Sequence, residues 1–555
     1  MKKLVLSAFV AMAAVAAATP AALAQTVCPA APAATVLSGN LSTQTLSRNT
    51  IYLLQGFVYV PSGVTLTIEP GTIIKGDKAS KGTLIVQRGG KLIADGTPQQ
   101  PIVFTSNQPA GSRARGDWGG IILCGSAPQN LPGDPTIEGG PVANFGGTNA
   151  TDNSGILRYV RIEFPGIEFQ TNNEINGLTL GGVGNGTTID YVQVSYSGDD
   201  SFEWFGGTVN AKHLIAFRGT DDDFDTDNGY SGKVQYGVAL RDPQVADVAS
   251  GGASNAFESD NDATGTTNSP QTSAVFSNMS VFLPSPLTSA DPAFQRGVHI
   301  RRNSAMSLFN SVVTGFRRGV LVDGATTEAN LTSGASVFKN NVFAEINSGS
   351  TTNYYAVNTG STFDASAYFN NADRANTTYT AVGPLNFSAT NFAINTNVAP
   401  GFGLPTASPL LTGAAFTDSK LTDAFFEKTG TYRGAFGATN WAEGWTNFNP
   451  QITCYNLPGL TLAAKPASDQ LQQLTVSPNP AAGEASLNFE LKRSGTASVR
   501  VLDVTGRTVA TVLADGKLAA GTQKVALPAT LKAGVYLAQV TTNETAQSVR
   551  FVVAK

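Results

Sequence analysis

From Val58 onward, the chain alternates hydrophobic and polar residues over short runs. Val64, Leu66 and Ile68 alternate with polar positions, and Gly or Pro ends most of the runs. A period of two is typical of β-strands that bury one face. No long stretch beyond the N-terminus shows clear helical periodicity. The pattern therefore predicts an all-β protein built as a sandwich, a barrel or a solenoid.

A repeat of 22 residues along the chain decides among these architectures. The sequence "GDDSFEWFGG" at residues 198–207 returns as "TDDDFDTDNG" at residues 220–229. "RGVHIRRN", from Arg296, is followed at the same step by "RGVLVDGA", from Arg318. Periods of 20–50 residues indicate units that stack on their neighbours. A unit this short, without a helix, predicts one coil of a parallel β-helix.

Stacking of these coils assigns side chains to the two faces of the strands. If Phe202 points into the solenoid, Glu203 points out, because side chains alternate along a strand. The repeat then predicts an inward column of Phe202, Phe224, Phe257, Val298 and Val320. It also predicts an outward column of Glu203, Asp225, Glu258 and His299.

The first coils resemble those of a known superfamily. They end in "GTPQQPIVFTS" and are followed by "GDWGGIIL". Together with the repeat, these segments resemble the pectin-lyase-like right-handed parallel β-helices, over residues 37–449. The resemblance implies a β-helix domain with inserted loops at residues 25–450, and it carries fold rather than activity.

The C-terminal part has a different pattern. We expect a linker at residues 451–473, followed by about seven short strands at residues 474–555, which suit a small immunoglobulin-like β-sandwich. The segments "SPNP", "VLDVTGR", "LKAGVYLAQV" and "VRFVVAK" resemble the type A C-terminal sorting domain of type IX secretion. The residues that match its motifs are Pro478, Asn479, Pro480, Gly506, Arg507, Gly534, Tyr536 and Lys555. The resemblance implies the type IX secretion machinery as a partner.

The N-terminus is typical of a signal peptide over residues 1–24. Two lysines precede an apolar run from Leu4 to Ala18, and "ALA" stands before Gln25. No other stretch approaches 18 apolar residues, so we expect no transmembrane segment in the mature chain. With the sorting resemblance, this implies a protein that is secreted or displayed on the outer surface of a Gram-negative bacterium.

Composition narrows the possible partners. Charged residues make up only 14% and the net charge is −4, so we expect no nucleic-acid partner. Cys28, Cys124 and Cys454 permit at most one intramolecular disulfide, and the sequence leaves all three pairings open. Only His213 and His299 are present, which excludes a His-rich zinc site.

Stacked carboxylates in the repeat pose an electrostatic problem, because coils lie about 4.8 Å apart and like charges repel at that spacing. A hard cation such as Ca²⁺, raised pKa values, or nearby arginines such as Arg296 and Arg301 would relieve it. Alternatively, the acidic turns are simply solvated, or they line a carbohydrate-binding or catalytic groove. The candidate Ca²⁺ ligands are Glu203, Asp222, Asp223, Asp225, Asp227 and Glu258.

No complete catalytic motif is present. The candidate catalytic residues are Asp200, Asp222, His299 and Arg296. Paired carboxylates suit glycoside hydrolysis, and an arginine beside Ca²⁺-binding carboxylates suits a polysaccharide lyase. We expect a non-catalytic secreted or surface protein that binds glycan or serves adhesion or the envelope. The alternative is a Ca²⁺-dependent lyase, or a glycoside hydrolase, that acts on an acidic polysaccharide.

Overall fold

The computed structural model describes residues 28–170, 173–247, 253–284, 290–349, 354–388, 390–394, 399–462, 471–492, 494–503, 508–542 and 546–554. Contacts divide the chain into two units, Met1–Thr461 and Leu462–Lys555. The predicted signal peptide, and Gly506, Arg507 and Lys555 of the predicted sorting motif, lie outside the described residues.

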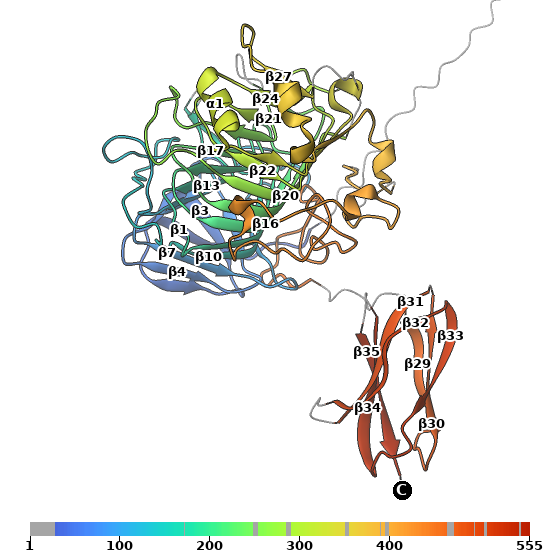
Figure 1. Ribbon diagram of the computed structural model, residues 1–555. Coiled ribbons are helices and arrows are strands. Elements are labelled where there is room, and N and C mark those ends of the chain that lie inside the picture. The colour runs from blue at the N-terminus through green and yellow to red at the C-terminus, as the bar shows by residue number, and fades with distance from the viewer. Residues whose placement is uncertain are drawn as a thin grey trace, which may run out of the picture. The chain divides into compact units, whose positions relative to one another are not determined.

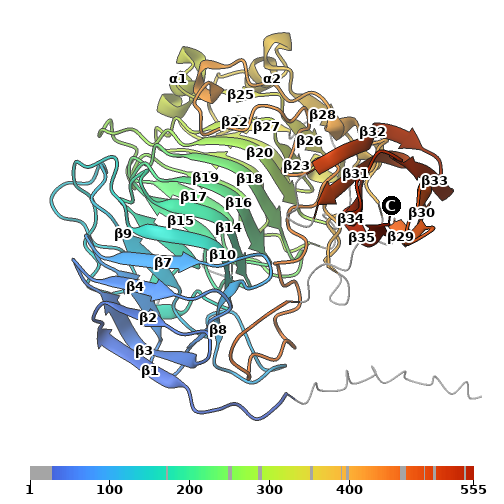
Figure 2. The same cartoon turned by 90° about the horizontal axis from the view of Figure 1, so that it is seen from below.

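The first unit is a parallel β-helix whose strands stack in three faces (Figures 1 and 2). The first coil contains β1 (Thr35–Asn40), which pairs with β3 (Ile51–Val60). The first face contains β6 (Thr83–Val86), β9 (Ile121–Cys124), β13 (Leu178–Gly181), β15 (Phe202–Phe205), β17 (Phe224–Asp227), β19 (Phe257–Ser259), β21 (Arg296–Ile300), β24 (Arg318–Val322) and β27 (Tyr355–Val357).

Long strands cross from the second face to the third. These are β10 (Gly155–Glu163), β14 (Thr188–Ser195), β16 (Asn210–Phe217), β18 (Lys233–Leu240) and β20 (Val275–Phe282). The second face adds β2 (Gln44–Leu46), β4 (Thr65–Ile68), β7 (Lys91–Asp95), β22 (Ser307–Phe309) and β25 (Phe338–Lys339). The third face adds β5 (Ile73–Gly76), β8 (Ile102–Ser106), β23 (Val312–Thr314), β26 (Val342–Ala344) and β28 (Thr377–Tyr379).

Short elements decorate the coils. A hairpin is formed by β11 (Glu168–Gln170) and β12 (Asn173–Glu174), and the helices are α1 (Ala325–Ser333) and α2 (Ala365–Phe369). Single 3₁₀ turns occur at Ile346–Gly349, Ala372–Arg374, Gly383–Leu385, Pro409–Leu411 and Ser419–Leu421.

The predicted inward column is confirmed. Phe202 pairs in register with Phe224, which pairs with Phe257, and the column continues through Val298 to Val320. All five side chains are fully buried. The rings of Phe202 and Phe224 stack with centroids 5.7 Å apart, and those of Phe224 and Phe257 are 5.3 Å apart. One coil per repeat therefore places like residues on one another, and their contacts form the core.

The long strands bend where one residue per coil adopts a left-handed backbone. Tyr159, Tyr191, His213 and Tyr236 have φ between 50° and 65° there. Such a conformation is unfavourable for bulky residues. It is offset by stacking, because the His213 ring lies 4.1 Å from the Tyr191 ring and 5.2 Å from the Tyr236 ring. His213 Nδ1 also lies 2.7 Å from Asp190 Oδ1, so this histidine belongs to a structural ladder.

The segment at residues 383–461 is largely irregular and covers the third face. Phe402 and Trp445 are buried against outward side chains of the long strands, such as Phe217 and Val238. Arg161 Nε donates to the carbonyl of Trp445 over 2.6 Å. This cover explains why β20 is buried on both faces. Coils proper end at β28, well before the predicted boundary at residue 450.

The predicted linker begins too early. Tyr455 is fully buried, and its hydroxyl donates to Glu163 Oε1 over 2.7 Å. Cys454 forms a disulfide with Cys28, while Cys124 is free and buried. Residues 451–461 therefore belong to the first unit, because the disulfide and the buried tyrosine fix them there.

Breaking this disulfide should destabilise the first unit. The bond closes a loop across 426 residues, and such a cross-link restricts the unfolded chain strongly. We expect Cys28→Ser to lower the free energy of unfolding by about 2–4 kcal/mol, measured by urea denaturation. A reducing agent should lower the stability of the wild type to the same level and leave Cys28→Ser unchanged. An equal stability of both proteins under oxidising conditions would contradict the prediction.

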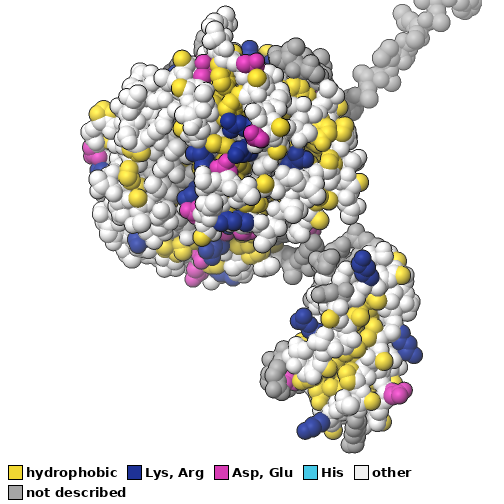
Figure 3. Space-filling view, viewed as in Figure 1, with side chains coloured by type: hydrophobic (Ala, Val, Ile, Leu, Met, Phe, Trp, Pro, Cys, Tyr) yellow, Lys and Arg dark blue, Asp and Glu magenta, His cyan; other side chains and the backbone are white. Residues whose placement is uncertain are grey.

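The second unit is a seven-stranded antiparallel β-sandwich, as predicted. One sheet contains β29 (Leu471–Ser477), β30 (Ala485–Leu491) and β33 (Gly521–Leu527). The other contains β31 (Gly495–Asp503), β32 (Thr508–Leu518), β34 (Gly534–Thr542) and β35 (Ala546–Val553). Asn479 of the "SPNP" motif accepts a 2.9 Å hydrogen bond from Val552 N, which ties the start of the unit to its last strand. Figure 3 shows a band of hydrophobic side chains on this unit, and Val509 and Val535 are among its exposed hydrophobic residues.

Candidate functional site

A cavity of about 400 Å³ lies on the outer side of the first face. Strands β17, β19 and β21 supply its walls, together with the turns before β15, β17 and β19 and the residues that follow β21 and β24. Its lining residues are Asp200, Asp221, Asp222, Asp225, Ala253, Glu258, Arg296, His299, Arg301 and Asp323. Nine of these ten side chains are ionisable, so the cavity suits a charged or hydroxyl-rich ligand rather than an apolar one. We call it the acidic cavity.

Three members of the predicted outward column, Asp225, Glu258 and His299, form one wall of this cavity, and Glu203 adjoins it on the neighbouring coil. Glu203, Asp225, Glu258 and His299 pair in register on successive coils. The column is more buried than an open solenoid face, since Glu203 is 7% exposed and His299 is 3% exposed. Burial strengthens the repulsion between the carboxylates of this wall, because like charges removed from water repel more strongly.

One half of the cavity holds carboxylates without cationic partners. Oxygens of Asp200, Glu203 and Asp225 lie within 4.8 Å of one another, as do those of Asp199, Asp200 and Asp221. Within the described residues, none of these side chains forms an ion pair, and the Oδ1 atom of Asp225 is buried without a hydrogen-bond partner. We call Asp200, Glu203 and Asp225 the carboxylate cluster.

Burial and mutual repulsion favour the protonated forms of these groups. Desolvation, followed by the charge of neighbouring carboxylates, raises the pKa of five side chains well above the usual value: Asp199, Asp200, Glu203, Asp221 and Asp225. Desolvation raises the pKa of Asp222 to about 7, with Glu258 as the next cause. A cation among these oxygens would remove the repulsion and lower the pKa values again.

The other half of the cavity is neutralised by protein cations. Arg301 forms ion pairs with Glu258 and, over 2.7 Å, with Asp260. His299 bridges two carboxylates, with Nδ1 3.1 Å from Glu258 and Nε2 3.3 Å from Asp323. Burial alone would raise the pKa of Glu258, but the hydrogen bond with His299 and the charge of Arg301 hold it below its usual value. Of the two arginines that the sequence offered as neutralising groups, Arg301 therefore forms ion pairs in this half, whereas Arg296 forms none among the described residues.

Three of the predicted cation ligands, Glu203, Asp223 and Asp227, are not in the cavity lining; Glu203 still contributes to the carboxylate cluster, whereas Asp223 and Asp227 lie elsewhere. Asp223 and Arg241 form an ion pair, with Nη1 and Oδ1 3.0 Å apart, and neither side chain has exposed surface. Asp227 does not line the cavity, although desolvation and then the charge of Asp260 raise its pKa to about 7. The reason is local: Asp223 stands in the turn before β17, where burial requires a counter-charge, and Asp227 stands at the far end of the strand.

The four predicted catalytic residues, Asp200, Asp222, His299 and Arg296, all line the cavity. Asn255, which the sequence did not single out, joins two of its carboxylates: Nδ2 donates to Asp222 Oδ2 over 3.2 Å and to Glu258 Oε2 over 3.0 Å. One amide nitrogen therefore holds these two acceptor oxygens close to each other.

One further polar partner comes from an insertion, and others stand at positions of the repeat. Asn176 Nδ2 donates to Glu203 and, over 3.2 Å, to Glu138 Oε1. Asn176 and Asn255 each stand two residues before the inward side chain of their coil, as Asp200 and Asp222 do. Asp323 follows β24 at a position that is acidic in earlier coils, where Asp227 and Asp260 stand. Glu138 stands in the insertion between β9 and β10, which has no counterpart one repeat away, so periodicity could not identify it.

Comparison with family models identifies the first unit. The model of the pectate-lyase-like β-helix domain matches residues 39–386, which is more than half of the chain. The chain belongs to the pectate-lyase-like β-helix family. In this family member, the match ends shortly after β28, the last strand of the coils.

The same comparison confirms the sorting domain. The model of the secretion-system C-terminal sorting domain matches residues 475–554, which form the sandwich. This β-helix protein is therefore secreted to the cell surface or beyond it by the type IX system. Among the described residues, no helix has the length and apolarity needed to cross a membrane.

Other comparisons add little for this family member. No curated protein matches its sequence. Among solved structures, the Dettilon tailspike protein (gp208) is similar at 11% identity with a TM-score of 0.24. That match covers 58% of this chain and 62% of the tailspike chain, less than two thirds of its length.

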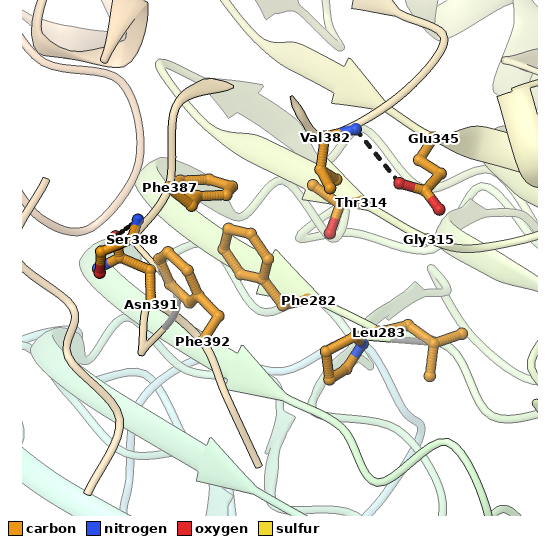
Figure 4. Close-up of a pocket in the computed structure, with 11 residues that line it drawn as sticks. Phe282, Leu283, Thr314, Gly315, Glu345, Val382, Phe387, Ser388, Asn391 and Phe392 are labelled. Carbon is orange, nitrogen blue, oxygen red and sulfur yellow. Dashed lines mark hydrogen bonds between the residues drawn. The ribbon is translucent and has the colours of Figure 1, made fainter. Parts of the chain in front are cut away.

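A second cavity, of about 340 Å³, lies at the third face and is mainly apolar (Figure 4). Phe282 and Phe392 stack with centroids 3.5 Å apart, and Phe387 packs beside them. Glu345 at its rim accepts a 3.2 Å hydrogen bond from Val382 N. Glu345 is the one ionisable residue among the described residues that line this second cavity. The second cavity therefore has fewer groups that could bind a charged ligand or act in acid–base catalysis than the acidic cavity.

Proposed function

We propose that this surface β-helix protein binds a polysaccharide in the acidic cavity, with a hard cation such as Ca²⁺ held by the carboxylate cluster. The observation that carries the proposal is a large, highly polar cavity in which one group of carboxylates has no cationic partner among the described residues. Such a protein would serve adhesion or the organisation of the cell envelope.

The donor set fits a hard cation. Ca²⁺ takes six to eight oxygen ligands, mostly from carboxylates, carbonyls and water. Asp200, Glu203 and Asp225 supply carboxylate oxygens within 4.8 Å of one another, and the buried Oδ1 of Asp225 lacks a partner. Thr179 adds support, because it pairs in register with Glu203 and its buried hydroxyl is also without a partner.

The size and lining of the cavity favour a sugar beyond the ion. A volume of about 400 Å³ far exceeds the space that one ion needs, and it lies in the range of small-ligand sites. Carboxylates accept hydrogen bonds from sugar hydroxyls, while Arg296, whose Nε atom is buried without a partner, can donate to ligand oxygens. Location at the cell surface exposes the cavity to extracellular polysaccharides.

A binding experiment tests this function. The full mature chain is run through gels that contain neutral or acidic polysaccharides, with CaCl₂ or with EDTA. We expect retardation by at least one polysaccharide in CaCl₂, and loss of retardation in EDTA and in the Asp200→Asn/Asp225→Asn variant. Asp95→Asn is the control, because the Asp95 side chain on β7 is 42% exposed and its ion pair among the described residues is with Arg158 at the surface. No retardation of the wild type by any polysaccharide would contradict the proposal.

A second candidate function is glycoside hydrolysis by Asp222 and Glu258, favoured by the amide of Asn255 that joins them. Their pKa values shift in opposite directions, as expected for an acid and a base. The shared amide keeps the two carboxylates close together, as retaining enzymes require for carboxyl groups roughly 5–5.5 Å apart. Arg301 is a poor lyase base because two carboxylates hold its proton, which leaves Arg296 for that role.

Release of reducing ends without new ultraviolet absorbance would establish hydrolysis of a retained polysaccharide, whereas reducing ends that appear together with new ultraviolet absorbance would indicate a lyase. If Asp222 is the acid, Asp222→Asn should reduce product formation by at least about 100-fold and leave retardation in the gel unchanged. Unaltered product formation in this variant would remove the acid–base pair from consideration.

A further inference from the structure

An open groove of about 510 Å³ lies beside the acidic cavity, and its lining includes Lys78, Lys81 and Arg115. The groove and the cavity are adjacent along two turns. Gly198 and Thr220 line the groove, while Asp200 and Asp221, one or two residues further along, line the cavity. A chain-like ligand that leaves the cavity across these turns therefore meets the groove.

Glycines at the floor of the groove let its turns pack closely. Gly116, Gly166 and Gly198 come from separate segments, and each is in the lining. A Cβ atom on Gly166 would collide with the backbone nitrogen of Gly198, and one on Gly198 would collide with the carbonyl of Gly166. The two turns therefore meet as bare backbone, and side chains are excluded at these points.

Two cations of the groove have no acidic partner. Among the described residues, Lys81 and Arg115 form no ion pair, whereas Lys78 pairs with Asp117 over 2.9 Å. Lys81 Nζ donates to the carbonyls of Glu168 and Phe169, over 3.1 and 2.8 Å, which leaves one of its three N–H groups. Arg115 Nε and Nη2 both donate to the carbonyl of Arg218, at 3.1 and 2.9 Å.

These contacts hold both cations in place without neutralising them. Arg115 also lies over the Tyr196 ring at 5.1 Å, and Lys81 lies over Phe169 at 5.0 Å. Burial lowers the pKa of Arg115 to about 10, against the opposing effect of the nearby Asp242 charge, so the group remains charged at neutral pH. Asp242 itself forms its ion pair with Arg218. Glu168 is the carboxylate among the lining residues, and its carbonyl, rather than an ion pair, contacts Lys81.

We infer that this groove is an anion subsite, in which Lys81 and Arg115 bind an anionic substituent of the polysaccharide held in the acidic cavity. The inference rests on the proposed function and names the ligand class: a glycan that carries carboxylate, sulfate or phosphate groups. Positioned, partly desolvated N–H donors are the groups that bind such oxyanions. The cation in the cavity and the cations in the groove then bind neighbouring parts of one acidic chain.

Inorganic sulfate is the probe for the subsite, titrated calorimetrically into the full mature chain with CaCl₂ present. We expect Lys81→Gln to weaken sulfate binding about tenfold, as for loss of one charge-assisted hydrogen bond. Arg115→Gln should do the same. Lys91→Gln is the matched control, because Lys91 is an exposed lysine on β7 that forms no ion pair among the described residues. Its affinity should equal that of the wild type.

The outcomes separate this inference from the proposed function. Lys81→Gln should keep the wild-type melting temperature without sulfate and the same rise on addition of CaCl₂. No sulfate binding by the wild type, or equal binding by Lys81→Gln and wild type, overturns the anion subsite and leaves the carboxylate cluster untouched. Sulfate binding that is lost in Lys81→Gln, with no polysaccharide retained in the gel assay, supports the subsite and defeats the proposed function.

Discussion

Asp223→Asn should lower the free energy of unfolding of the first unit by about 3–5 kcal/mol. Asp223 and Arg241 form an ion pair with no exposed side-chain surface. Arg241 also donates to the carbonyls of Thr220 and Asn255, over 3.2 and 3.3 Å, and lies 5.0 Å from the Phe294 ring. Loss of the carboxylate leaves a buried guanidinium without its counter-charge, which is the costly case for buried ion pairs.

Urea denaturation followed by tryptophan fluorescence measures this loss, since all four tryptophans lie in the first unit: Trp118, Trp204, Trp441 and Trp445. Asp225→Asn is the matched control. It removes a carboxylate two residues away that has like charges around it, so without divalent cations it should not destabilise the protein. The double variant Asp223→Asn/Arg241→Met should regain stability relative to Asp223→Asn. A change below about 1 kcal/mol in Asp223→Asn would show that the pair is not needed.

Without divalent cations, the protein should be more stable at pH 5 than at pH 8. Asp222 has a folded-state pKa of about 7, compared with about 3.9 in an unfolded chain. The unfolded state therefore loses its proton first as the pH rises, and stability falls between about pH 4 and pH 7, by up to about 1.4 kcal/mol per pH unit for each such group. Asp200, Glu203 and Asp225, with pKa values well above the usual range, contribute to the fall in the same direction.

The titration of His299 in the cavity also makes the protein less stable as the pH rises. Hydrogen bonds with Asp323 and Glu258 outweigh the effect of burial and raise the pKa of His299, so its contribution is present at low pH and is lost as the pH rises through that value. Glu258 and Asp323 have lowered pKa values, and their contributions are lost only in acid. Stability should therefore be greatest at about pH 4–5.

Saturating Ca²⁺ should reverse the loss at pH 8. Binding at about 100 times Kd adds about 2.7 kcal/mol, and less at pH 5, because protons compete for the same oxygens. Melting temperatures at the two pH values, in EDTA and in CaCl₂, measure both effects. The Asp200→Asn/Asp225→Asn variant should show a smaller pH slope and no response to Ca²⁺. A wild-type melting temperature at pH 8 that is the same in EDTA and CaCl₂ would contradict cation binding.

Much of the fold could be predicted from the sequence, because in a stacked repeat each residue contacts the residue one repeat away. The constant step of the repeat fixed which side chains adjoin, from Phe202 on Phe224 to Glu203 beside Asp225. It held across the insertion before Phe257, since alternation within a strand restores the register. The sorting domain followed in the same way from motifs at fixed positions.

The sequence by itself determined the coils, their register, the sandwich and the column of ionisable groups on the first face. Only the tertiary structure decided that Cys28 pairs with Cys454, that residues 451–461 belong to the first unit, and that Asp223 pairs with Arg241 inside the protein. It also brought Glu138, which stands in an insertion, to Asn176 beside Glu203. The physical reason is that repeats specify contacts one coil away, whereas insertions and the covering segment make contacts between distant residues that no period encodes.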